Sequence, residues 1–164
     1  MTVLHENWLN LNEIERGFMN EIKRAKAYAK HHHFGQVDKA GVDYFLGHIT
    51  TVAHKVACAK YSNEYVVVAF LHDTVEDTSA TIEEIGLEFG ADIANAVDAM
   101  SKRKGEDYDT YLQRILSNKL ASVVKFYDME HNSDIGRLSV VTEKDLKRRE
   151  KYRKYMGLLE KNFL

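Results

Sequence analysis

The feature that most constrains this chain is an apolar run that passes directly into charged residues. The run YVVVAFL occupies residues 65–71, and a histidine and three carboxylates follow it within six residues. Its β-branched residues favour a strand. However, Ser62 and Glu64 ahead of the run are typical of a capped helix start, and the length of the pattern, up to about Val75, favours a helix. We therefore predict a buried helix that ends against a cluster of charge.

The rest of the chain also follows helical periodicity. From Leu11 to Lys30, apolar side chains recur at steps of three and four, which places them on one face of a helix. The chain contains no proline, which permits helices without requiring them. We expect an all-α helical bundle. Its predicted helices are 11–30, 48–61, 62–75, a short helix capped by Thr78 or Ser79 and ending at Glu88, 91–100, 108–117, 118–138 and 145–159.

Length and composition describe one domain. We assign all 164 residues to it, with the core motifs at about 26–138 and a C-terminal helix at about 143–160. The single cysteine excludes an internal disulfide framework and indicates a reducing compartment. A formal net charge of -2 offers no general field for nucleic acid or a membrane surface. No run of about eighteen apolar residues and no signal-peptide pattern occur, so a cytoplasmic protein is expected.

The charged residues after the apolar run have the spacing of a metal site. His72 and Glu76 are four residues apart, as are Asp73 and Asp77, so on a helix each pair shares a face. An imidazole and a carboxylate suit a divalent transition metal such as manganese, iron, cobalt or zinc. One turn further on, Glu76 and Asp77 could accept a proton from water or orient it.

Two other segments offer further ligands. GHITTVA places His48 at the start of a predicted helix, and VVKFYDMEHN places Asp128 directly after an apolar stretch. Asn132 lies four residues after Asp128, on the same helical face. With His72 and Asp73, these residues make two imidazoles and two carboxylates, which leaves coordination positions open as a catalytic site needs.

Four segments in this order resemble the HD superfamily of metal-dependent phosphohydrolases, and more narrowly the hydrolase domain of RelA/SpoT-type enzymes. The resemblance covers roughly residues 26–138. Its segments are AKAYAKHHHFGQVDKAG, HITTVA, AFLHDTVEDTSATIEEIGLEFGADIANAVDAMSK and VVKFYDMEHNSDIGRL. The family consists of helical HD domains that remove pyrophosphate from the 3′ position of ppGpp, guanosine 3′,5′-bis(diphosphate). The resemblance implies the same fold and activity here, and a role in the stringent response.

The resemblance also implies roles for individual residues. It implies one divalent ion, usually manganese, held by His48, His72, Asp73 and Asp128, with Glu76 and Asp77 as the catalytic acidic pair. The substrate-side candidates are Asn132 as a nucleotide contact, Lys39 near the phosphates, Tyr44, and His131 as a neighbour of Asn132. His33, Arg103, Lys104 and Arg114 are weaker candidates for contacts to phosphate. The expected partner is a small-molecule nucleotide, and a homo-oligomer stays open.

Departures from the family pattern fall on the nucleotide side. Asp38 stands where the family has an arginine that packs on the guanine base, so we expect weak base stacking and repulsion of phosphates. The segment between Tyr44 and His48 is one residue longer than in the family, and Ile135 stands where a small polar contact is expected. One alternative is therefore an HD hydrolase of another nucleotide, such as a deoxynucleoside mono- or triphosphate. The second alternative is a non-catalytic HD module that binds a nucleotide or signals.

Overall fold

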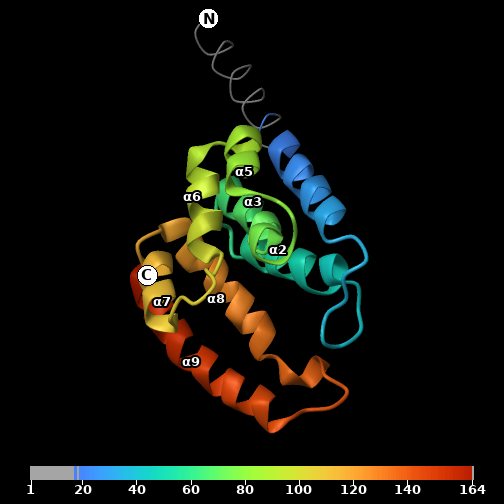
Figure 1. Ribbon diagram of the computed structural model, residues 1–164, viewed down its shortest axis with the longest axis vertical. Coiled ribbons are helices and arrows are strands. Elements are labelled where there is room, and N and C mark those ends of the chain that lie inside the picture. The colour runs from blue at the N-terminus through green and yellow to red at the C-terminus, as the bar shows by residue number, and fades with distance from the viewer. Residues whose placement is uncertain (1–16, 18, 164) are drawn as a thin grey trace, which may run out of the picture.

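The computed structural model describes residues 17 and 19–163 and confirms an all-α fold (Figure 1). Among these residues, the only β structure is an isolated bridge between Val37 and Asp43. The expected start of the first helix, Leu11, lies outside the described residues. Residues 19–32 are helical, so this helix continues two residues beyond the predicted end at Lys30. The assignment of the chain to a single domain stays a prediction.

The second helical segment begins earlier than expected. A π-helix, η1 (Phe45–Ile49), leads without a break into α2 (Thr50–Cys58). His48 therefore lies inside a helix and not at its start. The helix ends at Cys58, three residues before the predicted end at Tyr61.

The apolar run forms the buried central helix, α3 (Asn63–Leu71), with α2 and α8 packed against it (Figure 1). Its residues 66–71 are all buried, which explains why the sequence shows no polar face. The predicted end near Val75 is wrong, because the helix stops at Leu71 and a turn carries His72 and Asp73. Ser62 occupies the N-cap position, but its side chain makes no capping hydrogen bond.

Three short helices follow the turn: α4 (Thr74–Asp77), α5 (Ile82–Phe89) and α6 (Ala91–Met100). The predicted cap at Thr78 or Ser79 is wrong, since Thr81 caps α5. Its hydroxyl accepts from the Glu84 N–H, and the Glu84 carboxylate accepts from the Thr81 N–H. Gly90 ends α5 as predicted, at a φ of 87° that favours glycine.

The last helices are α7 (Tyr108–Leu116), α8 (Lys119–Ser133) and α9 (Glu143–Phe163). A single helix over 118–138 is wrong, because α8 stops at Ser133 and a 3₁₀ turn, η2 (Ile135–Arg137), follows. α9 packs lengthwise on α8 (Figure 1). Within the described part of the chain, no helix is both long and apolar enough to cross a membrane.

Candidate metal centre

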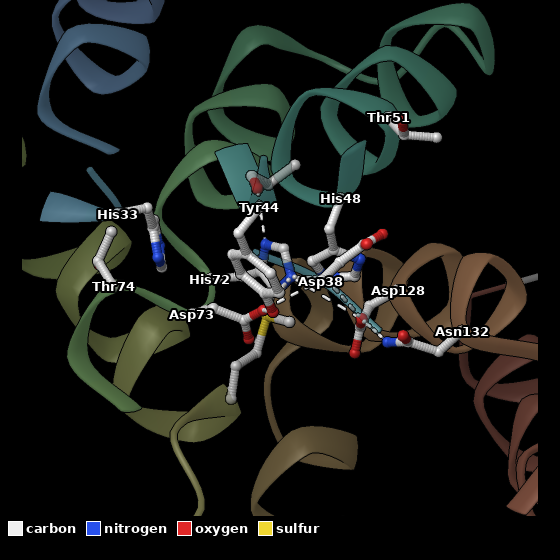
Figure 2. Close-up of polar contacts among 12 residues, drawn as sticks. His33, Asp38, Tyr44, His48, Thr51, His72, Asp73, Thr74, Asp128 and Asn132 are labelled. Carbon is white, nitrogen blue, oxygen red and sulfur yellow. Dashed lines mark hydrogen bonds and ion pairs between the residues drawn. The ribbon is translucent and has the colours of Figure 1, made fainter. Parts of the chain in front are cut away.

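Four side chains from three separate segments of the sequence meet in the interior of the bundle (Figure 2). His48 comes from η1, His72 and Asp73 from the turn after α3, and Asp128 from α8. Both histidines and Asp128 are buried. The ligand atoms of these three residues all lie within 4.8 Å of one another. The structure therefore brings together the four residues expected to hold a metal.

The separations between these atoms suit ligands of a single ion. Nε2 of His48 lies 3.2 Å from Nε2 of His72, and Oδ2 of Asp73 lies 3.3 and 3.1 Å from those two nitrogens. Oδ1 of Asp128 lies 3.2 Å from the His48 nitrogen and 3.8 Å from the His72 nitrogen. Two atoms bound about 2.1 Å from one ion at angles of roughly 90–130° lie about 3.0–3.8 Å apart. The donor set could thus hold a divalent ion.

Hydrogen bonds fix the orientation of the candidate ligands. Nδ1 of His72 lies 2.7 Å from the carbonyl oxygen of Ala69, which makes Nδ1 the donor and turns the Nε2 lone pair toward the cluster. The Tyr44 hydroxyl donates to Oδ2 of Asp73 at 2.6 Å. The Asn132 amide donates to Oδ1 of Asp128 at 2.6 Å. Tyr44 and Asn132, expected as substrate contacts, thus support the metal cluster directly.

Lys125 borders the metal cluster and was not expected there from the sequence. Its ammonium group pairs with Oδ2 of Asp128 at 2.8 Å and lies over the Tyr111 ring. Burial alone would raise the pKa of Asp128, but Lys125 and His48 hold it well below its usual range. Lys125 occupies one carboxylate oxygen while the other faces the imidazoles. The available signal was a lysine within an apolar stretch, three residues before the aspartate.

The carboxylates of the cluster favour the protonated form of His48. Burial alone would lower the pKa of His48, but hydrogen bonds to Asp128 and Asp73 raise it to about 9. Because only a neutral imidazole binds a metal, an ion must displace that proton.

The expected acidic pair lies on α4, immediately after the turn. Partial burial and the neighbouring carboxylates raise the pKa of both Glu76 and Asp77. Oε2 of Glu76 accepts a hydrogen bond of 2.7 Å from the backbone N–H of Lys102. These residues are not one turn along the helix of the apolar run, as predicted, because α4 is a separate helix. The pair nevertheless adjoins Asp73, since the Asp77 N–H donates to the backbone carbonyl oxygen of Asp73 at 3.0 Å.

Arg114 builds the loop that contacts Glu76. Its guanidinium donates to the carbonyl oxygens of Asp98 and Ser101 and to the carboxylate of Glu106. These bonds lower the pKa of Glu106 to about 2. Arg114 is therefore committed to contacts within the protein, and its expected contact to phosphate is not supported.

The segment between Tyr44 and His48, expected to be one residue longer than in the family, runs through the π-helix. An i+5 turn contains one more residue than an α-helical turn. η1 can therefore accommodate one added residue while Tyr44 still reaches Asp73 and His48 still faces His72. Gly47 permits this packing, because a Cβ atom there would lie 3.0 Å from Val42 and 3.3 Å from the Asp38 carboxylate.

The remaining substrate-side candidates lie around the cluster. Lys39 pairs with Asp145 at 3.0 Å, at the edge of a cavity beside His48. His131 is buried with its ring 5.0 Å from that of His48, and burial lowers its pKa to about 4. It lines a different cavity, so it is not placed beside Lys39. Contact of either residue with a substrate stays a prediction.

The end of the first helix reaches the acidic pair through Gln36. The Gln36 side chain donates to the backbone carbonyl of Asp77 at 3.0 Å and accepts from Nδ1 of the fully buried His33 at 2.7 Å. His33 is thus part of the support around α4.

These features define a class of protein: an all-α domain with a buried His–His–Asp cluster that could bind a divalent metal. Within that class, the HD domain family matches residues 25–124, and the chain belongs to this family.

Two curated relatives show where the similarity lies. The chain is 38% identical over 102 residues to guanosine-3′,5′-bis(diphosphate) 3′-pyrophosphohydrolase of Aquifex aeolicus, covering 59% of this chain and 14% of that protein. It is 30% identical over 125 residues to a GTP pyrophosphokinase of Myxococcus xanthus, covering 68% of this chain and 16% of that protein. The chain spans about a seventh of each relative, so their activities are not transferred by similarity alone.

A solved structure supports the fold. The chain superposes with a TM-score of 0.68 and 22% sequence identity on a solved structure, that of a metazoan ortholog of SpoT that hydrolyzes ppGpp. The superposition covers 87% of this chain and 84% of the other. At this identity the likeness supports the shared architecture and no finer statement.

Proposed function

We propose that this chain is a metal-dependent nucleotide phosphohydrolase whose substrate is ppGpp, from which it removes the 3′ pyrophosphate. The carrying observation is the convergence of four ligand-type side chains next to two carboxyl groups with raised pKa values. The substrate rests on the name of the Aquifex aeolicus relative. Manganese is the ion we propose, because the resemblance to the RelA/SpoT-type hydrolases implies it; the donor set itself also suits iron, cobalt or zinc.

The reaction requires one bond to form and one to break. His48, His72, Asp73 and Asp128 would hold a divalent ion, which would stabilise the phosphate charge as a Lewis acid and lower the pKa of water. Glu76 or Asp77 takes the proton of the water whose oxygen attacks the phosphorus attached to O3′. The bond from phosphorus to O3′ then breaks, and O3′ leaves with the electron pair and takes up a proton. The products are pyrophosphate and GDP.

The raised pKa values of the acidic pair serve the proton transfer. A carboxylate with a raised pKa is a stronger base than an ordinary surface carboxylate. The backbone N–H of Lys102 donates to the Glu76 carboxylate and holds it in position.

The test is a panel of nucleotides incubated with purified protein and manganese, with products separated by chromatography. We expect pyrophosphate and GDP from ppGpp, and a Glu76→Gln variant that retains metal but loses activity by about 100- to 10,000-fold. Glu160→Gln, at an exposed position on α9, is the matched control and should keep full activity.

Two other outcomes would replace the proposal. Turnover of a deoxynucleoside mono- or triphosphate in place of ppGpp would keep the chemistry and change the substrate. No turnover of any nucleotide by the metal-loaded protein would favour a non-catalytic binding or signalling module.

A further inference from the structure

A cavity of about 180 Å³ adjoins the metal cluster on the side of α8 and α9. The residues that matter for its chemistry are Lys39, Tyr44, His48, Asn132, Arg137 and Arg148. The acidic pair is not among its lining residues, because Glu76 faces the loop at Lys102.

The cavity carries excess positive charge. Lys39 and Arg148 share Oδ1 of Asp145, at 3.0 and 3.1 Å. Arg137 pairs with Oδ2 of Asp38 at 2.7 Å. Three cations thus face two carboxylates, which favours an anionic ligand.

Asp38 anchors Arg137. Its side chain is 5% exposed, and Oδ1 accepts from the backbone N–H groups of Ala40 at 2.8 Å and Val42 at 3.0 Å. The expected repulsion of phosphates by Asp38 therefore finds no support, because this carboxylate is bonded on both oxygens and neutralised by Arg137. The one acidic departure from the family pattern positions a guanidinium that the sequence reasoning did not consider.

Arg137 keeps an edge of its guanidinium for a ligand. Its Nη2 lies 3.5 Å from the side-chain amide oxygen Oδ1 of Asn132, at the limit of a hydrogen bond. Its Nε is buried and has no hydrogen-bond partner in the described part of the chain, and the same holds for Nε of Arg148. A buried donor without a partner is costly, and the Nε–Nη2 edge of arginine matches two phosphate oxygens.

We propose that Arg137, held in place by Asp38, binds a phosphate group of the substrate other than the one attacked. For ppGpp this is the 5′-diphosphate, so the inference rests on the proposed function. Arg137 then sets the affinity for a nucleotide phosphorylated at both ends and leaves the chemical step to the residues around the metal.

The kinetic test separates binding from chemistry. Arg137→Ala should raise KM for ppGpp about 10- to 100-fold and leave kcat nearly unchanged, because a charge-assisted contact is lost. With guanosine 3′-diphosphate, which lacks the 5′ phosphates, the same substitution should leave KM unchanged. Arg153→Ala is the control, since this arginine on α9 has a 63% exposed side chain outside the cavity. An unchanged KM for ppGpp in Arg137→Ala would overturn the proposal.

Two further variants guard against misfolding of Arg137→Ala. Asp38→Asn and Arg137→Lys both disturb the ion pair between Asp38 and Arg137 while keeping a polar side chain at each position. Each should raise KM for ppGpp. Asp38→Arg should raise it as well, since it removes the anchor. A lowered KM in Asp38→Arg would show that the base stacks at position 38 and that our assignment is wrong.

A binding measurement distinguishes failure of this inference from failure of the proposed function. If the wild-type protein does not hydrolyse ppGpp, calorimetric titration of the metal-free protein with inorganic pyrophosphate still tests Arg137. We expect at least about tenfold weaker binding in Arg137→Ala than in wild type and Arg153→Ala. Equal binding by all three proteins would exclude an anion site at Arg137.

Discussion

Replacing Lys125 by methionine tests the electrostatics of the centre most directly. Methionine matches the length of the lysine stem but cannot pair with Asp128. The ion pair spans 2.8 Å, and the two side chains are only 13% and 5% exposed. Lys125→Met therefore leaves the buried carboxylate of Asp128 without its closest cation.

The expected loss follows from this burial. Removing one partner of a buried pair costs about 3–5 kcal/mol. Unfolding entropy of about 2.1 cal/mol/K per residue gives roughly 0.34 kcal/mol/K for 164 residues. Dividing the loss of unfolding free energy by this entropy predicts a fall in Tm of about 9–15 °C for the metal-free protein.

The chain offers a matched control in Lys55→Met. Lys55 pairs with Glu130 at 2.7 Å, but these side chains are 36% and 42% exposed. An exposed pair contributes about 0–1 kcal/mol, so Tm should fall by less than about 3 °C. Thermal unfolding of both variants is followed by circular dichroism, first in chelator and then with excess manganese. Manganese should reduce the fall in Tm of Lys125→Met, because the ion supplies positive charge beside Asp128. Equal Tm values for the two variants in chelator would refute the reasoning.

Three other predictions concern the ligands and their support. His72→Ala should abolish stoichiometric metal in elemental analysis, whereas full retention would exclude His72 as a ligand. Tyr44→Phe removes the donor to Asp73 and should weaken metal affinity about 10- to 100-fold in competition with a chelator; an unchanged affinity would make this contact incidental. Glu106→Gln tests pH dependence: the folded pKa of Glu106 is lowered to about 2, so its stabilisation is present above the usual 4.5 and is lost as pH falls toward 2. The Tm difference between wild type and Glu106→Gln should shrink over that range, and a constant difference would contradict the role of the Arg114 contact.

The helices were predictable where apolar residues recur at a regular spacing. α6 agrees with the predicted 91–100 and α7 with 108–117 to within one residue. The ends of α3 and α8 were not predictable, because helical periodicity continues past both into residues that the structure uses in turns. Local spacing does not reveal that the turn after α3 is needed to bring His72 and Asp73 toward His48.

The positions of the expected metal ligands were predictable, whereas their surroundings were not. Charged residues directly after apolar runs identified His72, Asp73 and Asp128. The pairing of Asp38 with Arg137 joins residues 99 positions apart, and no local pattern marks it. From the sequence, Asp38 indicated repulsion of phosphates, and only its ion pair with Arg137 changes that interpretation.

The π-helical turn at Phe45–Ile49 also affects how relatives of this chain can be recognised in genomes. Each residue of an α-helix turns the chain by about 100°, so deleting one residue here without changing the helix type would swing Tyr44 away from Asp73. A π-turn makes such a length change compatible with both contacts. For any relative that carries one residue fewer here, the alignment gap therefore falls inside a helix. A search pattern written from this chain, with its fixed four-residue step from Tyr44 to His48, would miss such a relative.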